Sequence, residues 1–579
     1  LKALSRGHKA FRVSPSVIKK GVDMLHPSAD SKDSQVPRRP PNEVCALERM
    51  GAAFPTRLSF MRLLLRRMAK EKWRIQRERF DLDDQGFGKA VYRVALPNRS
   101  YSLAAFSNPL ADDKRTDRVI ASAWDAVFVL FDGQPTERDL DRLGENAPHQ
   151  EAGRFEATDL VISRANRSIR LFEYACDCLA QGLQPDPEKM LEVGYLMRTT
   201  AVYGNGKFGI SDHARVSLRE EAQNSFQIEM LTVYLIRLFT TDQLDHIASC
   251  RAPDRAVKLS PDLKRSLGIG NSTGLGMAPF VVSHPELLHE WFYARETALS
   301  RIRSLADVSS ESVTRARLLT QRAIRHLQQW RLDDPQYQAR NQRLMDDLQM
   351  LEHWLSEADA QPRSQQFWNL VYRDSEAHLS IDGQEILVAL LLEVYPDVVE
   401  GLDESFYSSE TRVLDVRKTV YEFSALLDDH YAWTDRFDFS KDSQNAHFWY
   451  VSENKLEPRF GRRFDEPGAD KEMPVAIARD MAALRSALGA FDNAALLADF
   501  LLARPEFRHL VRRAQALSEY EYGEIQDNLI AAQTSPLDIL RFKLACFGAA
   551  KFDPKSALWT RITMFQGAPL RLELGDPSF

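Results

Sequence analysis

The chain has 579 residues, of which 44% are hydrophobic and 27% are charged, and this composition excludes a largely disordered protein. A chain this long exceeds one compact core, so several domains are expected, and its five scattered cysteines predict free thiols in a reducing, cytoplasmic compartment. The net charge is −6, but residues 1–80 carry 19 Lys and Arg against 7 Asp and Glu, a net of +12, so the remainder carries −18.

Residues 1–45 are predicted to form a basic N-terminal arm and linker, because residues 26–43 are rich in Pro, Ser and Asp. A basic amphipathic helix is predicted to begin near Pro55, with an apolar stripe that extends to Trp73. The positive charge has two interpretations. It can bind nucleic acid or a membrane surface, or it can dock on the acidic body of the same chain or of a second subunit. We favour the docking interpretation.

Residues 46–150 are expected to combine this basic helix with a small antiparallel sheet. Segments 90–96, 101–107 and 118–131 are rich in aromatic and β-branched residues, and turn signals separate them. The last of the three segments also fits a helix.

Residues 151–430 are predicted to be a helical core. A long helix is expected from about residue 157 to Gly182, and the sequence Asp186-Pro187-Glu188 predicts the start of the next one. Segment 213–239 ends in residues that are apolar on most faces, which predicts a central helix. Further helices are expected as three long, bundle-like segments within 285–358 and as shorter ones near 384–400 and 412–428, the last capped by Ser408 or Ser409.

Residues 431–579 are predicted to comprise an irregular aromatic and charged loop, up to about residue 475, followed by helices to about residue 550. The tail at 559–574 is expected to add a strand or a clasp. The fold class predicted for the whole chain is therefore mainly α, with a bundle-like core and a small antiparallel sheet near the N-terminus.

A glycine-rich run within Ser266–His289 is the main functional candidate. Four glycines fall between residues 268 and 276, and Asn271, Ser272 and Thr273 stand among them. Glycines can expose main-chain N–H groups to an anion, and a helix that begins nearby would favour negative charge. The run matches neither the dinucleotide-binding glycine pattern nor a phosphate-binding loop that ends in Lys-Ser/Thr. The alternative is a tight turn in which glycine only permits close packing.

A second glycine–asparagine segment, Tyr203–Gly209, contains Asn205 and Lys207. Lys207 could neutralise the anion that the later run holds, while the simpler interpretation is an ordinary turn. We expect the two segments to converge on one pocket. The predicted substrate-binding residues from these segments are Asn205, Lys207, Gly270, Asn271, Ser272 and Thr273.

Two further positions are predicted to carry chemistry. His284 lies next to the proposed anion site and is the first candidate for proton transfer, although a packed or capping histidine is the alternative. Glu453 is the second candidate, and Arg459 and Arg462 near it are predicted to bind substrate carboxylate or phosphate. A surface salt-bridge network explains that cluster equally simply.

These features predict a cytoplasmic enzyme that acts on a small anionic metabolite, a carboxylate or a phosphate. Lyase or isomerase chemistry is expected, because no redox or nucleotide motif is visible in the sequence. No metal site, no cofactor and no membrane span are expected. The protein is expected to form a homo-oligomer. The alternatives are an interaction protein whose basic arm docks on an acidic partner, and a binder of nucleic acid or membrane surfaces through residues 1–80.

Overall fold

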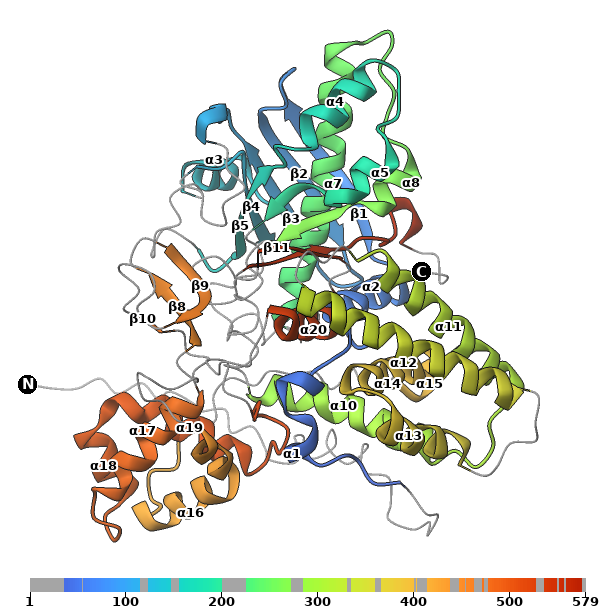
Figure 1. Ribbon diagram of the computed structural model, residues 1–579. Coiled ribbons are helices and arrows are strands. Elements are labelled where there is room, and N and C mark those ends of the chain that lie inside the picture. The colour runs from blue at the N-terminus through green and yellow to red at the C-terminus, as the bar shows by residue number, and fades with distance from the viewer. Residues whose placement is uncertain are drawn as a thin grey trace, which may run out of the picture.

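The chain folds into a mostly helical protein built beside one large mixed sheet, as the computed structural model shows (Figure 1). The structure describes residues 36–54, 56–114, 123–146, 156–199, 225–271, 285–330, 335–359, 366–399, 402, 414–437, 447–452, 455–462, 471–472, 477–526, 536–548, 551–556 and 559–574.

The sheet has nine strands in the order β1-β2-β3-β4-β5-β6-β7-β12-β11. Neighbouring strands are antiparallel except β6 and β7, which are parallel. The sheet is larger than the small N-terminal one predicted, because it also recruits strands from the predicted helical core and from the C-terminal tail. The strands are β1 Arg74–Leu82, β2 Gly88–Ala95, β3 Ser100–Ser107, β4 Ala126–Asp132, β5 Asp159–Arg167, β6 Tyr195–Thr199, β7 Gly268–Asn271, β11 Lys551–Ser556 and β12 Trp559–Met564.

Two predicted helices are wrong in part. The basic helix α2 (Phe60–Lys70) ends early, since Lys72 has a positive φ of 54° and the edge strand β1 follows. The long helix expected from residue 157 is instead strand β5 followed by helix α4 (Phe172–Ala180). The middle of β5 is buried on both faces, and such strands read as continuous apolar runs without the alternation that marks a half-exposed strand.

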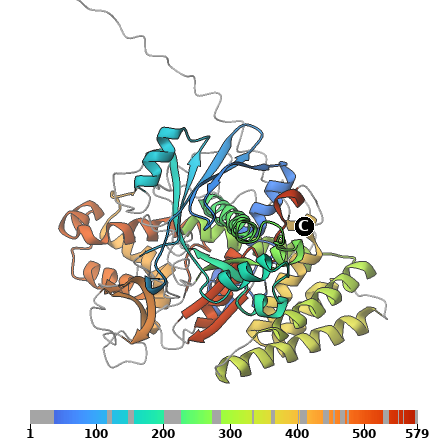
Figure 2. The ribbon, with the colours of Figure 1, turned by 90° about the horizontal axis from the view of Figure 1, so that it is seen from above.

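Helices cover both faces of the sheet. Helix α3 (Glu137–Asn146) packs its leucines against one face. Helix α7 (Ser225–Arg251) lies on the other, inside the curve of the sheet (Figure 2), where the ring of Phe239 meets that of Phe128 at 5.4 Å. The prediction of a central helix is confirmed within residues 225–239, but the helix continues to Arg251.

Arg237 is a charged residue in the apolar, buried part of α7, and hydrogen bonds compensate its burial. Its guanidinium donates hydrogen bonds to five carbonyl oxygens, which belong to Lys264, Arg265, Leu267, Ala568 and Pro569. These acceptors lie at the end of helix α8 (Pro261–Ser266), at the start of β7 and in the C-terminal tail. The buried charge therefore ties the tail to the centre of the protein.

The three long helices predicted within 285–358 are confirmed as α10 (Pro285–Arg303), α11 (Ser310–Gln328) and α12 (Pro335–Asp359); α11 and α12 pack on each other, whereas α10 packs on the helices that follow them in the chain. The Ser309 side chain caps α11 by accepting the Ser312 N–H. Helix α14 (Ile381–Val394) is buried all round, as its run of leucines and valines requires. The remaining shorter helices before the C-terminal third of the chain are α1 Pro41–Val44, η1 Leu47–Arg49, η2 Asp112–Lys114, α5 Pro187–Val193, α13 Phe367–His378 and α15 Pro396–Val399.

The C-terminal third is also helical. Helix α16 (Val420–Tyr431) begins at a capping box formed by Thr419 and Glu422, whereas the predicted caps Ser408 and Ser409 lie outside the described residues. The remaining helices are η5 Ala432–Arg436, α17 Ile477–Gly489, α18 Leu497–Ala503, η7 Pro505–Phe507, α19 Arg508–Leu517, α20 Pro536–Phe547 and η8 Arg571–Glu573.

The segment expected to be irregular contains a three-stranded antiparallel sheet, so that prediction is wrong where the structure describes the chain. Its strands are β8 (His447–Ser452), β9 (Lys455–Arg462) and β10 (Lys471–Glu472). The expectation that the tail at 559–574 adds a strand is confirmed by β12, which pairs with β11 just before it.

A buried ionic cluster anchors the described part of the N-terminal segment. The Arg39 guanidinium donates from Nε and Nη2 to both carboxylate oxygens of Glu296, each at 2.8 Å, and from Nη1 to Glu385, also at 2.8 Å. Arg49 also pairs with Glu385, and Arg295 pairs with both glutamates, which are almost completely buried. Basic residues near the N-terminus thus serve to hold the chain against helices α10 and α14.

Candidate functional site

Strands β6 and β7, which precede the first glycine-rich segment and contain the start of the second, end side by side. Strand β6 ends at Thr199, strand β7 ends at Asn271, and the two strands are parallel neighbours with Arg198 registered against Gly270. Residues 200–224 and 272–284, which follow the two strands, lie outside the described residues. The carboxyl ends of adjacent parallel strands are a common place for ligand binding in sheets covered by helices.

Two arginines stand on one face of the sheet beside these strand ends. Arg198 of β6 lies opposite Asn166 of β5, so both side chains are on the same face. Arg164 shares that face, because it precedes Asn166 by two positions on the same strand. Arg164 and Arg198 are therefore diagonal cross-strand neighbours, a relation that places residues about 7–8 Å apart and lets long side chains meet.

Hydrogen bonds fix this arrangement from both faces of the sheet. On the opposite face, the hydroxyl groups of Ser163 and Thr199 hydrogen-bond at 2.7 Å and hold β5 in register with β6. On the arginine face, Asn166 accepts the Asp125 N–H and donates to the Ala123 carbonyl, which secures the chain that leads into β4. The two arginines are thus presented by rigid strands.

The electrostatic environment of Arg164 suits an anion. Burial lowers the pKa of its guanidinium to about 10, and the guanidinium carbon lies 5.6 Å from the ring centre of Trp124. Arg198 is only 6% exposed. A phosphate or carboxylate near these groups would favour their charged forms and could accept paired N–H bonds from each planar fork.

Glycine at positions 268 and 270 is explained by packing. A Cβ on Gly270 would lie 2.7 Å from the ring of Tyr195, and one on Gly268 would lie 2.1 Å from the Met564 carbonyl oxygen. Both residues are in an interior strand, whereas the sequence interpretation placed the whole run in a loop. The close-packing alternative therefore accounts for these two glycines, and Gly270 as a ligand contact stays a prediction.

The structure places few of the other predicted site residues. Asn271 ends β7, paired with Ile562 of β12, while Arg459 and Arg462 lie in β9, paired with Tyr450 and His447. The side chains of Asn271, Arg459 and Arg462 are not among those that the structure describes. The predicted residues outside the described ranges altogether are Asn205, Lys207, Ser272, Thr273, His284 and Glu453.

Sequence reasoning missed Arg164 and Arg198 as site residues. Arg164 fell within the segment that was interpreted as a helix, where its strand face could not be recognised. The run Leu160-Val161-Ile162 was the available signal, because consecutive apolar and β-branched residues are typical of a buried strand. Arg198 directly precedes the first glycine segment, but only the strand pairing connects it with Arg164.

His289, five residues after the proposed proton-transfer residue His284, is a buried structural histidine. Its Nδ1 accepts the Tyr522 N–H at 3.1 Å, and its ring stacks on Tyr293 with 5.5 Å between ring centres. Burial and then the positive charge of Arg38 lower its pKa to about 4, so it is neutral at pH 7.

No group of three His, Cys, Asp or Glu side chains within the described ranges is arranged to hold a metal ion. Where the chain is described, none of its helices combines the length and the apolar character needed to cross a lipid bilayer. Comparison with protein-family models, with curated proteins and with solved structures gives no match.

Proposed function

We propose that the protein binds a small anion, a carboxylate or a phosphate, at the carboxyl ends of β6 and β7. One observation carries this proposal: β6 and β7 are parallel neighbours, and β6 precedes the first glycine-rich segment in the chain while β7 contains the start of the second. Arg164 and Arg198 stand on one face of the sheet beside that junction.

The chemistry of the two arginines matches the proposed ligand class. Two planar guanidinium groups on neighbouring rigid strands can grip a tetrahedral or planar oxyanion with paired hydrogen bonds. Their burial strengthens the attraction to an anion, because the interaction is less screened than at an exposed site. The proposal also includes proton transfer of the lyase or isomerase type, with His284 or Glu453 as the acid or base, which rests on the sequence alone.

A ligand screen tests the binding step. Thermal unfolding of the full chain is followed with phosphate, citrate or succinate, and with chloride at matched ionic strength. A ligand that binds only the folded state raises the melting temperature. We expect at least one oxyanion to raise it in the native protein, and the shift to disappear in Arg164→Gln and Arg198→Gln.

Arg93→Gln is the matched control, because Arg93 is a partly exposed strand arginine of the same sheet that pairs with Glu78. It should retain the shift. Equal shifts in all variants would place the anion elsewhere. NMR of the bound compound then tests turnover, and an unchanged compound would reject the proton-transfer step alone.

A second candidate, docking of the basic N-terminal segment on the acidic body of its own chain, is favoured by a specific set of ion pairs. Arg39 pairs with Glu296 and Glu385, and Arg62 of α2 pairs with Glu393 of α14. Arg77 and Arg79 of β1 pair with Asp242 and Glu137. These contacts use positive charge that a nucleic acid or a membrane surface would otherwise attract.

A further inference from the structure

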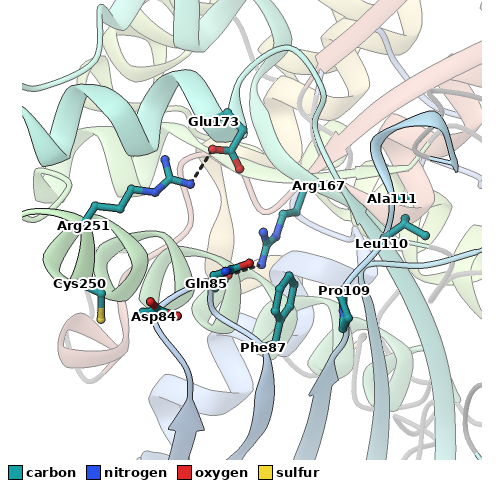
Figure 3. A pocket seen from close by; sticks show the side chains of 10 residues that line it. All are labelled: Asp84, Gln85, Phe87, Pro109, Leu110, Ala111, Arg167, Glu173, Cys250 and Arg251. Atoms are coloured by element: carbon teal, nitrogen blue, oxygen red, sulfur yellow. Dashed lines mark hydrogen bonds and ion pairs between the residues drawn. The ribbon is translucent and has the colours of Figure 1, made fainter.

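Arginines on the surface of this protein commonly pair with carboxylates. In the lining of a cavity of about 710 Å³ beside the end of β5, Arg251 donates to Glu173 at 2.8 Å, and it also donates to Asp177 at 2.9 Å (Figure 3). On helix α11, Arg317 donates to Glu352 of α12 at 2.8 Å. Such pairs neutralise the charge locally, and they set apart the exposed arginines that have no carboxylate partner.

Three arginines on the outer face of helix α11 have no such partner. Arg315, Arg322 and Arg325 are exposed, and none of them forms an ion pair or a side-chain hydrogen bond with a residue in the part of the chain that the structure describes. Leu318 lies among them on the same face, since steps of three and four residues follow one side of a helix, and it is 58% exposed. We call these four residues the arginine stripe. The opposite face of α11 is buried in the core and consists of Val313, Ala316, Thr320, Ala323 and Leu327.

The helix itself accounts for only part of this charge. An anion in the first turn and a cation in the last turn favour helix formation, which explains Glu311 and Arg325. Arg315 and Arg322 lie between these turns, so the helix dipole does not explain them. Glu311 is four positions before Arg315, whereas no acidic residue lies three or four positions from Arg322 or Arg325. The arginine stripe therefore keeps a net positive charge.

We propose that the arginine stripe docks an acidic α-helix of a partner protein. Arg315 and Arg322 are seven residues apart, which is about 10 Å along the helix axis, so carboxylates seven residues apart on the partner helix can meet both. An apolar side chain between those carboxylates covers Leu318, and a third carboxylate meets Arg325. Arginine is enriched in protein–protein interfaces, and anchors at steps of three, four and seven residues are the pattern by which helices are recognised.

The exposed leucine and the buried apolar face of α11 disfavour other occupants. A nucleic acid would set its charged sugar–phosphate backbone against Leu318 and leave that side chain without an apolar contact. A membrane surface requires an exposed apolar face, whereas that of α11 is packed inside the protein. A second copy placed on the same face by a two-fold axis would bring two sets of arginines together. An acidic helix satisfies both the charge and the leucine.

Fluorescence anisotropy of the full chain with a labelled peptide tests this proposal. The acidic peptide has about three heptads, blocked ends, Glu at every seventh position, Leu three positions after each Glu, and Ala and Gln elsewhere. Its companions carry Gln or Lys in place of Glu, and an oligothymidylate serves as the nucleic-acid probe. We expect micromolar binding of the acidic peptide, as suits a small contact, and weaker binding when the salt concentration rises from about 50 to about 300 mM. The Gln peptide should bind more weakly than the acidic peptide.

Arg315→Glu/Arg322→Glu is the test variant. Both residues are exposed and glutamate suits a helix interior, so the fold is expected to persist. Affinity for the acidic peptide should fall about tenfold or more, and affinity for the Lys peptide should rise. Arg301→Glu/Arg373→Glu is the matched control, because it changes the net charge equally at exposed positions of α10 and α13. It should retain the binding of the acidic peptide.

Leu318→Ala leaves every charge in place and should weaken the binding of the acidic peptide about threefold, because an apolar contact is lost. Four results would overturn the proposal. They are no binding of the acidic peptide to the native protein, equal affinity of the native protein and Arg315→Glu/Arg322→Glu, an equal loss in the Arg301→Glu/Arg373→Glu control, and tighter binding of oligothymidylate that is lost in Arg315→Glu/Arg322→Glu. The last result would assign the arginine stripe to nucleic acid.

Discussion

Two groups of arginines in this protein, one around Arg39 and one at Arg164, differ in how their surroundings shift the pKa of the guanidinium. Burial alone would lower the pKa of Arg39, but the carboxylates of Glu296 and Glu385 more than offset it and raise that pKa well above its usual value. Arg164 in the sheet shows the opposite, because burial lowers its pKa to about 10. The carboxylates determine the direction of the pKa shift in the first group, whereas burial determines it at Arg164. The comparison separates a structural use of arginine from the use proposed for binding.

The largest expected loss of stability comes from breaking the buried ion pairs of Arg39. Arg39→Met leaves Glu296 and Glu385 buried with less compensating charge, and removing one partner of a buried ion pair typically costs about 3–5 kcal/mol. We expect a loss of that size in the free energy of unfolding, measured by urea denaturation. Arg417→Met is the control, because Arg417 is highly exposed in its pair with Asp415 and should change stability by less than about 0.5 kcal/mol. Equal effects of the two substitutions would remove the distinction.

Acid should lower the stability of the region around Arg39, where His289 lies, within a defined pH window. His289 has a folded-state pKa of about 4 against 6.5 for an unperturbed histidine, so the unfolded chain binds its proton first as the pH falls. Stability is then lost between pH 6.5 and 4, by roughly 2–3 kcal/mol for this residue. His289→Asn, which keeps an acceptor for the Tyr522 N–H, should flatten that part of the stability–pH curve. An unchanged slope would assign the acid sensitivity to other groups.

Substitution of Gly270 tests whether strand β7, beside the proposed anion site, needs glycine for packing. Gly270→Ala forces a methyl group against the ring of Tyr195, and overpacking of this kind costs about 1–3 kcal/mol. Gly489→Ala is matched to it, because a Cβ there meets nothing within 4 Å. Thermal unfolding should separate the two variants. If Gly270→Ala is as stable as the native protein, the packing explanation of this glycine fails.

The smallest expected effect on stability is that of Arg164→Met. Since burial disfavours the charge of Arg164, an apolar side chain of similar length should change the free energy of unfolding by less than about 1 kcal/mol. Set beside Arg39→Met, this measurement sharpens the difference between the two groups. A loss as large as that of Arg39→Met would make Arg164 a structural residue.

The sequence predicted the parts of the fold that depend on local signals. Helices α10 to α12 follow from apolar spacing and from the Ser309 cap, all within one stretch of chain. The sheet could not be predicted in the same way, because β7 pairs with β12 from nearly 300 residues later in the chain. Strand β5 has near its start an apolar run on both faces and lacks the alternation that identifies a strand, and Arg164 was missed with it.

The proposed site shows the same division between local and distant information. Composition identified the two glycine-rich segments, but the parallel pairing of β6 and β7, the strands on which the proposed site depends, is encoded by no local pattern. Of the predicted site residues that the structure describes, Gly270 has a packing role that the sequence offered only as an alternative. Arg164 and Arg198 could be identified as neighbours only from the register of β5 and β6.

The most direct test of the central claim is the affinity of the full chain for the oxyanion that gives the largest thermal shift, measured by titration calorimetry in the native protein and in the Arg164→Gln/Arg198→Gln double variant. We predict that affinity falls by about a hundredfold or more in the double variant, because two charge-assisted contacts are lost, and that it is unchanged in Arg93→Gln. Equal affinity in the native protein and the double variant would contradict an anion site at the ends of β6 and β7.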